Sequence, residues 1–325
     1  MDYIKVTSMG SYYVGGKKVT ISGGEPFYAK LVDGWAEPKA YSPDGDYQAG
    51  QMYVKYTRIA DPVVPYPVCM IHGGGLTGAM WEQTLDGRPG WEYHFLKNGY
   101  HVNVSDGVER GRASWAKYPE INKEPPFFRS YDEAWQTFRL GEKYPVPYEG
   151  LRFDLSRFDD FMKQQVPRFP AAVKMAEEAY EAYFTHMASE GGYIVFAHSQ
   201  GGLFALRAAL KHPENIKAII LIESTSTMDV SQTDITALKD IPVLHMWADY
   251  IDDNYANENY AWAGRYAFTD TMRRFHEKML ELGGDSTWMY LPDMGIKHNS
   301  HAPMVEDNSD EIADLVIGWM KEHIH

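Results

Sequence analysis

The chain has 325 residues, a net charge of −14, and 44% hydrophobic and 23% charged residues, which is the composition of an ordinary globular protein. These values exclude a disordered, collagen-like or low-complexity chain. No Lys/Arg cluster is present to neutralise phosphates, so we expect no nucleic-acid partner. The single cysteine, Cys69, excludes an intrachain disulfide and a Cys-based zinc site.

Targeting signals are not visible in these residues. No charged segment followed by an apolar one opens the chain, and the longest apolar runs, such as residues 216–222, are far shorter than the ~20 residues that a membrane span needs. We therefore expect no membrane span and a cytoplasmic protein. A mature exported chain whose signal had been removed would have the same sequence features.

The first 60 residues are typical of short β segments. Gly15 and Gly16 separate residues 11–14 from residues 18–21, a pattern that predicts a hairpin. Residues 52–57 alternate apolar and polar side chains, as a half-buried strand does.

From residue 68 onward, strand-like and helix-like segments alternate. We expect strands at 68–71, 100–104, 193–197, 217–222, 242–247 and 287–291, and helices at 90–97, 171–187, 200–211, 269–282 and 309–323. This alternation predicts βαβ units, and so an α/β fold with a mostly parallel central sheet and helices on both faces. The acidic run 306–311 is expected to be a solvated start of the last helix.

Residues 115–170 interrupt this alternation. They hold seven prolines and one helical stretch, in which Tyr131, Trp135 and Phe138 share a face at positions i, i+4 and i+7. We interpret the segment as a cap or lid inserted into a single domain that spans residues 1–325. The aromatic stripe is expected to form the core of that cap.

A candidate nucleophile lies in the run Phe-Ala-His-Ser-Gln-Gly-Gly at 196–202, between a predicted strand and a predicted helix. The run matches the G-x-S-x-G nucleophile elbow with Ala197 in place of the first glycine. Small residues are needed because the turn from strand to helix is tight, and the turn exposes the Ser199 hydroxyl at a helix N-terminus. The structural alternative is that Ser199 caps the helix.

A candidate oxyanion loop, His72-Gly73-Gly74-Gly75, follows the predicted strand 68–71. In this place an α/β-hydrolase supplies one N–H of the oxyanion hole, and the residue after the nucleophile supplies the other. Alone the glycine run is equally typical of a flexible loop, but the two motifs together favour a hydrolase. His72 is interpreted as structural.

A serine nucleophile needs a base and an acid, and on this fold they follow it in the order acid, then histidine. His298 and His301 lie in the right region, and we favour His301. The acid has two candidates, Glu223 after the strand 217–222 and Asp249 after the strand 242–247. The residues alone leave this choice open.

The chain resembles a small group of bacterial α/β-hydrolase esterases whose acid is a glutamate after the strand that follows the nucleophile strand. The matching pieces lie at 12–16, 72–78, 81–82, 86–91, 111–114, 134–139, 141, 144–145, 198–201, 223 and 299–301. The resemblance implies that Ser199 is the nucleophile, His301 the base and Glu223 the acid. It also implies that Gly74 and Gln200 donate the oxyanion-hole N–H groups. The known esterase of this type has cysteines where Gly74 and Gly75 stand here, a departure that keeps the backbone donors.

Together these features predict a serine hydrolase that cleaves small to medium apolar or aromatic carboxylic esters through an acyl-enzyme. Amide, lactone or carbon–carbon bond hydrolysis on the same triad is the alternative, followed by a binding module with an idle triad. We expect no metal and no organic cofactor. The expected partner is a small-molecule ester, and a homodimer is left open.

Overall fold

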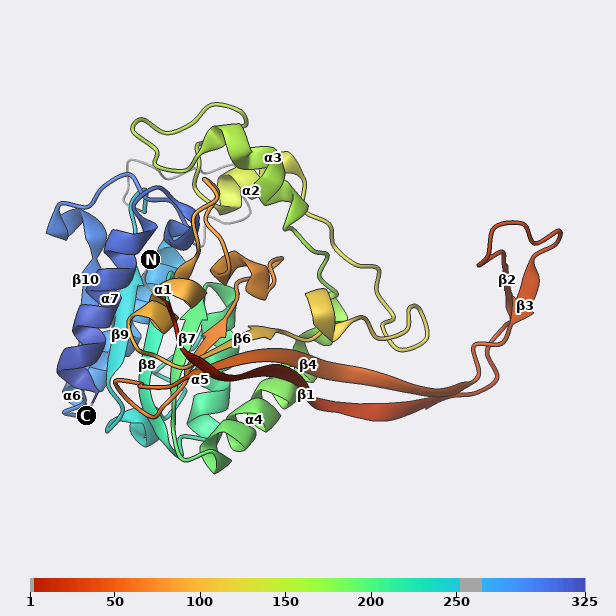
Figure 1. Ribbon diagram of the computed structural model, residues 1–325, viewed down its shortest axis with the longest axis horizontal. Coiled ribbons are helices and arrows are strands. Elements are labelled where there is room, and N and C mark those ends of the chain that lie inside the picture. The colour runs from red at the N-terminus through yellow and green to blue at the C-terminus, as the bar shows by residue number, and fades with distance from the viewer. Residues whose placement is uncertain (1–2, 252–264, 325) are drawn as a thin grey trace.

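The computed structural model describes residues 3–251 and 265–324, and within them eight strands form one sheet (Figure 1). The spatial order is β1-β4-β6-β5-β7-β8-β9-β10. The strands are β1 (Val6–Ile21), β4 (Gly45–Ile59), β5 (Val68–Ile71), β6 (Val102–Asp106), β7 (Tyr193–His198), β8 (Ile216–Ile222), β9 (Val243–Trp247) and β10 (Ser286–Tyr290).

Neighbouring strands from β6 across to β10 pair in parallel, whereas β1 and β4 join the sheet antiparallel. The predicted α/β fold class with a mostly parallel sheet is therefore confirmed. Because parallel strands end at the same edge of a sheet, the residues that follow β5, β7, β8 and β9 lie near one another. These are the places where the sequence puts its candidate site residues.

Helices cover both faces of the sheet. On one face lie α1 (Trp91–Lys97) and α7 (Ser309–His323), and on the other α4 (Val173–Ser189), α5 (Gln200–Lys211) and α6 (Arg265–Glu281). The side chains of β7 alternate between the two cores, as the period of two in a strand requires. Within the described residues, no helix combines the length and the hydropathy needed to cross a membrane.

The predicted hairpin at Gly15 and Gly16 is wrong. Strand β1 runs unbroken through both residues and pairs with β4 along its whole length. Both glycines have positive φ values, +70° and +79°. A Cβ on Gly15 would lie 2.9 Å from the Cα of Ala179 in α4, so this glycine allows a helix to approach the strand rather than allowing the chain to turn.

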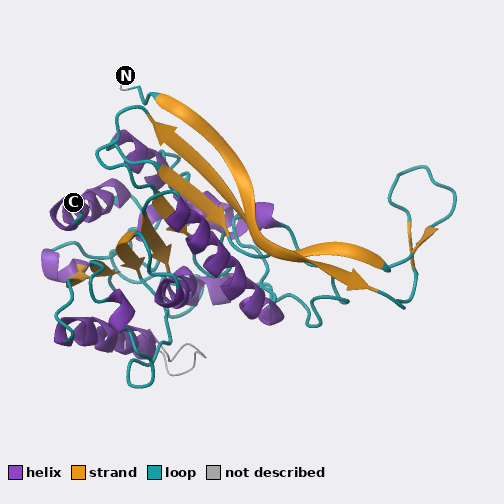
Figure 2. Cartoon of the chain, turned by 90° about the horizontal axis from the view of Figure 1, so that it is seen from below, coloured by secondary structure: helices purple, strands orange, loops and turns teal. Residues whose placement is uncertain are grey.

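The pair β1 and β4 continues past the sheet as a long arm, which Figures 1 and 2 show leaving the body of the molecule. Only residues 53–57 of β4 pair with β6, and beyond the sheet the two strands of the arm pair with each other. Helix α4 packs against part of the arm, where Lys17 pairs with Glu178. A small second sheet of β2 (Phe27–Ala29) and β3 (Lys39–Tyr41) forms its tip. The sequence indicated strands here but not that they would leave the sheet.

The chain between β6 and α4 carries two short helices, α2 (Tyr131–Thr137) and α3 (Phe158–Lys163), which lie together at one side of the body (Figure 1). Helix α2 starts at a capping box in which Ser130 and Glu133 exchange hydrogen bonds. Trp135 meets the rings of Phe158 and Tyr144 edge to face, at centroid distances of 5.2 and 5.3 Å. Aromatic packing thus gives this segment its own small core, and its role as a cap stays a prediction.

Candidate active site

Ser199 occupies a strained turn between β7 and α5, with φ 51° and ψ −123°. Such backbone angles are costly for a residue other than glycine and occur mainly at functional sites. A Cβ on Gly201 would lie 2.6 Å from the carbonyl oxygen of His72, so only glycine fits two residues after the serine. The Ser199 side chain makes no cap hydrogen bond to α5, which removes the structural alternative.

The structure brings together Ser199, His301 and Glu223. His301 Nε2 lies 2.8 Å from Ser199 Oγ, and His301 Nδ1 lies 2.9 Å from Glu223 Oε2. Glu223 directly follows β8, and His301 lies in the loop before α7. All three side chains are buried. This is the geometry in which a histidine, oriented by a carboxylate, can take the proton of a serine.

The two alternative residues have other partners. His298 Nδ1 lies 3.2 Å from the hydroxyl of Tyr250. Asp249 accepts the backbone N–H groups of His298 at 2.8 Å and of Tyr250 at 2.7 Å. Asp249 therefore shapes the loop before His301 rather than contacting its ring, and the geometry favours Glu223 as the acid.

Arg139 is a member of the site to which sequence reasoning gave no role. It binds Glu223 with both arms of its guanidinium, Nη1 to Oε2 at 2.5 Å and Nη2 to Oε1 at 2.8 Å. Burial alone would raise the pKa of Glu223, but the charges and hydrogen bonds of Arg139 and His301 hold it well below its usual range. Glu223 is therefore ionised. Arg139 lies one position after Phe138 of the aromatic stripe, so the insertion itself carries part of the site.

The backbone of His301 is fixed from two sides. Its N–H donates to the carbonyl of Phe138 at 3.0 Å, and its carbonyl accepts from His198 Nε2 at 2.7 Å. Burial, helped by neighbouring His301, lowers the pKa of His198 to about 3, so His198 is a neutral donor. His198, the residue before Ser199, thus helps to position His301, a contact that no spacing in the sequence reveals.

Glu306 corrects the expectation of a solvated acidic run, because its side chain is buried. Its two carboxylate oxygens accept the side-chain amide of Asn299 at 2.6 Å and the backbone N–H of Ser300 at 2.9 Å. Burial raises the pKa of Glu306 to about 7 in spite of these bonds. Glu306 therefore holds the two residues that lead into His301.

This pKa predicts a pH dependence of stability. Since the pKa of Glu306 is about 7 in the folded chain and about 4.5 ordinarily, its contribution to stability is complete below about pH 4.5 and is lost as pH rises to about 7. In urea unfolding at a series of pH values, Glu306→Gln should flatten this fall. Glu311→Gln, at an exposed glutamate of the same acidic run, should keep the wild-type slope. Equal slopes in both variants would contradict the assignment.

The candidate oxyanion loop faces the same cavity as the serine. A cavity of about 210 Å³ is lined by Ser199, His301, Glu223, Gly74 and Gln200. In the described part of the chain, neither the Gly74 nor the Gln200 N–H donates to another group. Both are therefore available to a substrate oxygen, as a pair of oxyanion donors must be.

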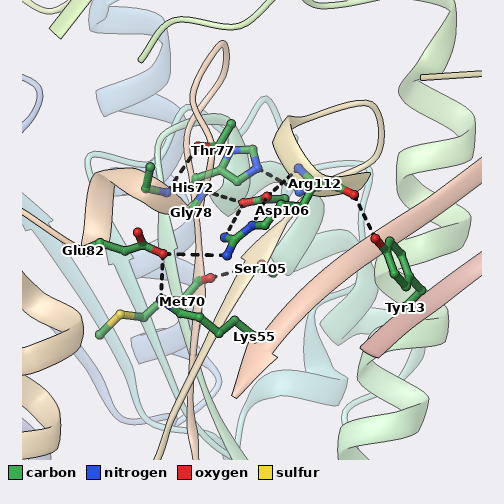
Figure 3. A network of polar contacts seen from close by, with 12 residues as sticks. Tyr13, Lys55, Met70, His72, Thr77, Gly78, Glu82, Ser105, Asp106 and Arg112 are labelled. Carbon is green, nitrogen blue, oxygen red and sulfur yellow. Dashed lines mark hydrogen bonds and ion pairs between the residues drawn. The ribbon is translucent and has the colours of Figure 1, made fainter. Parts of the chain in front are cut away.

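The oxyanion loop is supported from behind by a polar network (Figure 3). Asp106 accepts the N–H of Gly78 at 2.8 Å and is bound by the guanidinium of Arg112, Nε to Oδ2 at 2.7 Å. His72 Nε2 accepts the N–H of Gly107 at 2.9 Å, and burial lowers the pKa of His72 to about 4. The loops after β5 and β6 are thus tied together, which agrees with the structural role predicted for His72.

No group of three His, Cys, Asp or Glu side chains in the described ranges could hold a metal ion. The groups that face one another at the site are a hydroxyl, a hydrogen-bonded imidazole, a paired carboxylate and two backbone N–H donors.

The chain is similar to known proteins along most of its length. The chain is 28% identical to a solved bacterial esterase, with a TM-score of 0.83 over 99% of this chain and 98% of that one. It is 25% identical to a probable secreted lipase, phiG, of Fungal sp. (strain ATCC 74256), over 86% of this chain and 88% of the relative. Residues 66–252 match the model of the family described as having the alpha/beta hydrolase fold. Since this match spans more than half of the sequence and includes Ser199 and Glu223, the chain belongs to the α/β-hydrolase family, as its motifs predict.

Proposed function

We propose that the protein is a serine hydrolase that cleaves carboxylic esters through an acyl-enzyme, with Ser199, His301 and Glu223 as its triad. The observation that carries this proposal is the continuous hydrogen-bond chain from Ser199 Oγ through His301 to Glu223. It opens on the cavity that the oxyanion donors also line. The similarity to an esterase and to a probable lipase supports the ester as the bond that is broken.

In the first half-reaction Ser199 Oγ attacks the carbonyl carbon while His301 Nε2 takes its proton. Glu223 stabilises the imidazolium, and the N–H groups of Gly74 and Gln200 hold the negative carbonyl oxygen. The C–O bond to the alcohol then breaks, and the alcohol leaves with the proton of His301. Water then attacks the acyl carbon while His301 takes its proton. The bond between the acyl carbon and Ser199 Oγ breaks, His301 returns the proton to Ser199 Oγ, and the carboxylic acid leaves.

The size and walls of the cavity favour a small to medium substrate. Its volume of about 210 Å³ is below the ~300–1,000 Å³ of pockets for drug-sized ligands. Phe138, Leu203, Trp247, Ile251 and Phe268 supply apolar walls. We infer that at least one side of the ester is an apolar or aromatic group. Phe138 and Arg139 come from the inserted segment, and so we also propose that this segment acts as a cap that shapes the substrate site.

A fluorophosphonate probe tests the triad directly. The probe should react once per chain, and peptide mapping should place the label on Ser199, since a serine is reactive only beside its base. The labelled protein should lose hydrolysis of p-nitrophenyl acetate in proportion to labelling. A chain that stays unlabelled, or carries the label on another serine, would refute the mechanism. Faster turnover of p-nitroacetanilide than of the ester would favour the amide alternative.

The sequence predicts a cytoplasmic chain, while the lipase relative is described as secreted. Cell fractionation of the source organism would separate the two.

A further inference from the structure

A second cavity, of about 310 Å³, lies directly beside the catalytic one. The two cavities share Arg168 and Gln200 as lining residues. The second cavity lies against His72 and Gly73 of the oxyanion loop and against the start of α5. Its other walls are largely apolar, with Phe127, Phe169, Val173 and Phe204 among them. Of the residues that line this cavity, the ester mechanism proposed above uses only Gln200, which lines both cavities.

The second cavity contains a buried cation, Arg110. Its side chain is 9% exposed, and its guanidinium donates to the backbone carbonyl of Glu109 at 3.3 Å. No carboxylate of residues 3–251 and 265–324 forms an ion pair with Arg110. The Glu109 carboxylate is instead bonded by the side chain of Asn122. A buried guanidinium without a bonded anion is costly, and one so placed in a cavity is suited to bind an anion that enters it.

The charge of Arg110 persists at neutral pH. Burial and the positive charge of Arg168 lower the pKa of Arg110 only to about 10. Arg110 and Arg168 both line this cavity and repel each other, while the nearby Glu109 carboxylate attracts Arg110.

Arg168 lines both the cavity that contains Arg110 and the catalytic cavity. A Cβ placed on Gly74 would lie 3.2 Å from Arg168 Nη1 and 2.8 Å from Gln200 Oε1. Because Gly74 has no side chain, the Arg168 guanidinium has room to lie beside the oxyanion loop. An anionic group held by Arg110 would lie in the cavity next to the one that the ester carbonyl enters.

We propose that the second cavity binds a carboxylate of the substrate, so that the preferred ester carries one free carboxylate besides the ester bond. Arg110 is its binding residue, and the aromatic walls receive the methylene chain between the two groups. The chemical class is the half-esters of dicarboxylic acids, or esters of hydroxy acids if the carboxylate is on the alcohol side. This inference rests on the proposed ester hydrolysis, because it names the substrate class of the same site.

The test compares charged and neutral esters of equal length. Monoethyl esters of the dicarboxylic acids from succinate to sebacate are paired with ethyl esters of the matching monocarboxylic acids. Acetate esters of ω-hydroxy acids and of simple alcohols form the alcohol-side pairs. We expect the ratio of kcat/KM, charged over neutral, to exceed about 10 at one chain length, since a charge-assisted hydrogen bond contributes roughly 1.5–3 kcal/mol.

Arg110→Met removes the charge at nearly constant volume and should lower this ratio at least about 10-fold, while Arg110→Lys should keep part of it. A ratio taken within each variant does not depend on how much of the protein is folded. Arg207→Met serves as the matched control, because Arg207 lies in α5, pairs with Glu177 and lines neither of the two cavities. Its ratio should equal that of the wild type.

The outcomes separate this inference from the function on which it rests. If neutral esters are hydrolysed but the ratio stays near 1 at every length, or survives Arg110→Met, the carboxylate site is wrong and the ester hydrolase stands. If neither series is hydrolysed and the fluorophosphonate leaves Ser199 unlabelled, the ester hydrolase itself has failed.

Discussion

Replacing Ser199 by alanine is expected to lower kcat for p-nitrophenyl acetate by at least about 10⁴-fold, on the scale of triad serine deletions. The reason is geometric: the nucleophile is the oxygen that lies 2.8 Å from His301 Nε2, and alanine removes that oxygen and nothing else. The elbow should keep its shape, because the Ser199 backbone bonds to Ile222 and Thr225 do not involve its side chain. Residual activity would come from the oxyanion donors acting on a bound ester.

A second buried serine gives the matched control. Ser224 directly follows Glu223, is buried, and has no side-chain partner within the described residues. Ser224→Ala therefore removes a hydroxyl from the same region without touching the hydrogen-bond chain, and kcat should stay near the wild-type value. Thermal unfolding of both variants checks that they are folded. Full activity in the Ser199 variant would overturn the acyl-enzyme mechanism.

The fold could be predicted largely because its signals are local. Strands β5, β7 and β8 are largely apolar runs that end at or just before a histidine or a glutamate. The helices differ from them in the spacing of their apolar residues. The family follows from the same local signal at Ser199. The arm of β1 and β4 could not be predicted in this way. A Gly-Gly pair in a sequence is compatible both with a turn and with a strand that a helix approaches closely, as α4 does here.

The sequence predicted only those parts of the candidate site that belong to recognisable motifs. The spacing singled out Ser199 and the oxyanion loop, and the resemblance chose Glu223 over Asp249. The supporting contacts were missed because they join residues far apart in the chain, such as Arg139 with Glu223 and His198 with His301. Glu306 was misjudged for a related reason: an acidic run appears solvated in the sequence even when one of its members is buried.

The second prediction with a large expected effect concerns Glu223, the proposed acid of the triad. Glu223→Gln should lower kcat by about 10⁴-fold, by analogy with the loss when a triad Asp becomes Asn. A glutamine offers His301 Nδ1 no negative charge and can present an N–H that selects the wrong tautomer. Asp249→Asn is the matched control, because the Asp249 side chain accepts two backbone N–H groups and makes no contact with the His301 ring. Comparable losses in the two variants would contradict the choice of Glu223.

The loss of kcat in Glu223→Gln should exceed the loss expected from removing the carboxylate beside His301 alone, because the positive charge of Arg139 stays in place. Arg139 Nη1 lies 3.3 Å from His301 Nδ1, so without the carboxylate it becomes a buried, uncompensated cation beside a ring that must take up a proton. Breaking such a pair from one side typically costs about 3–5 kcal/mol of stability. The double variant Glu223→Gln with Arg139→Met removes both charges, and it should regain stability in urea unfolding and part of the lost kcat. If the double variant is no better than Glu223→Gln in either measurement, the charge of Arg139 does not act on His301, and the ion pair serves only to hold the Glu223 side chain in place.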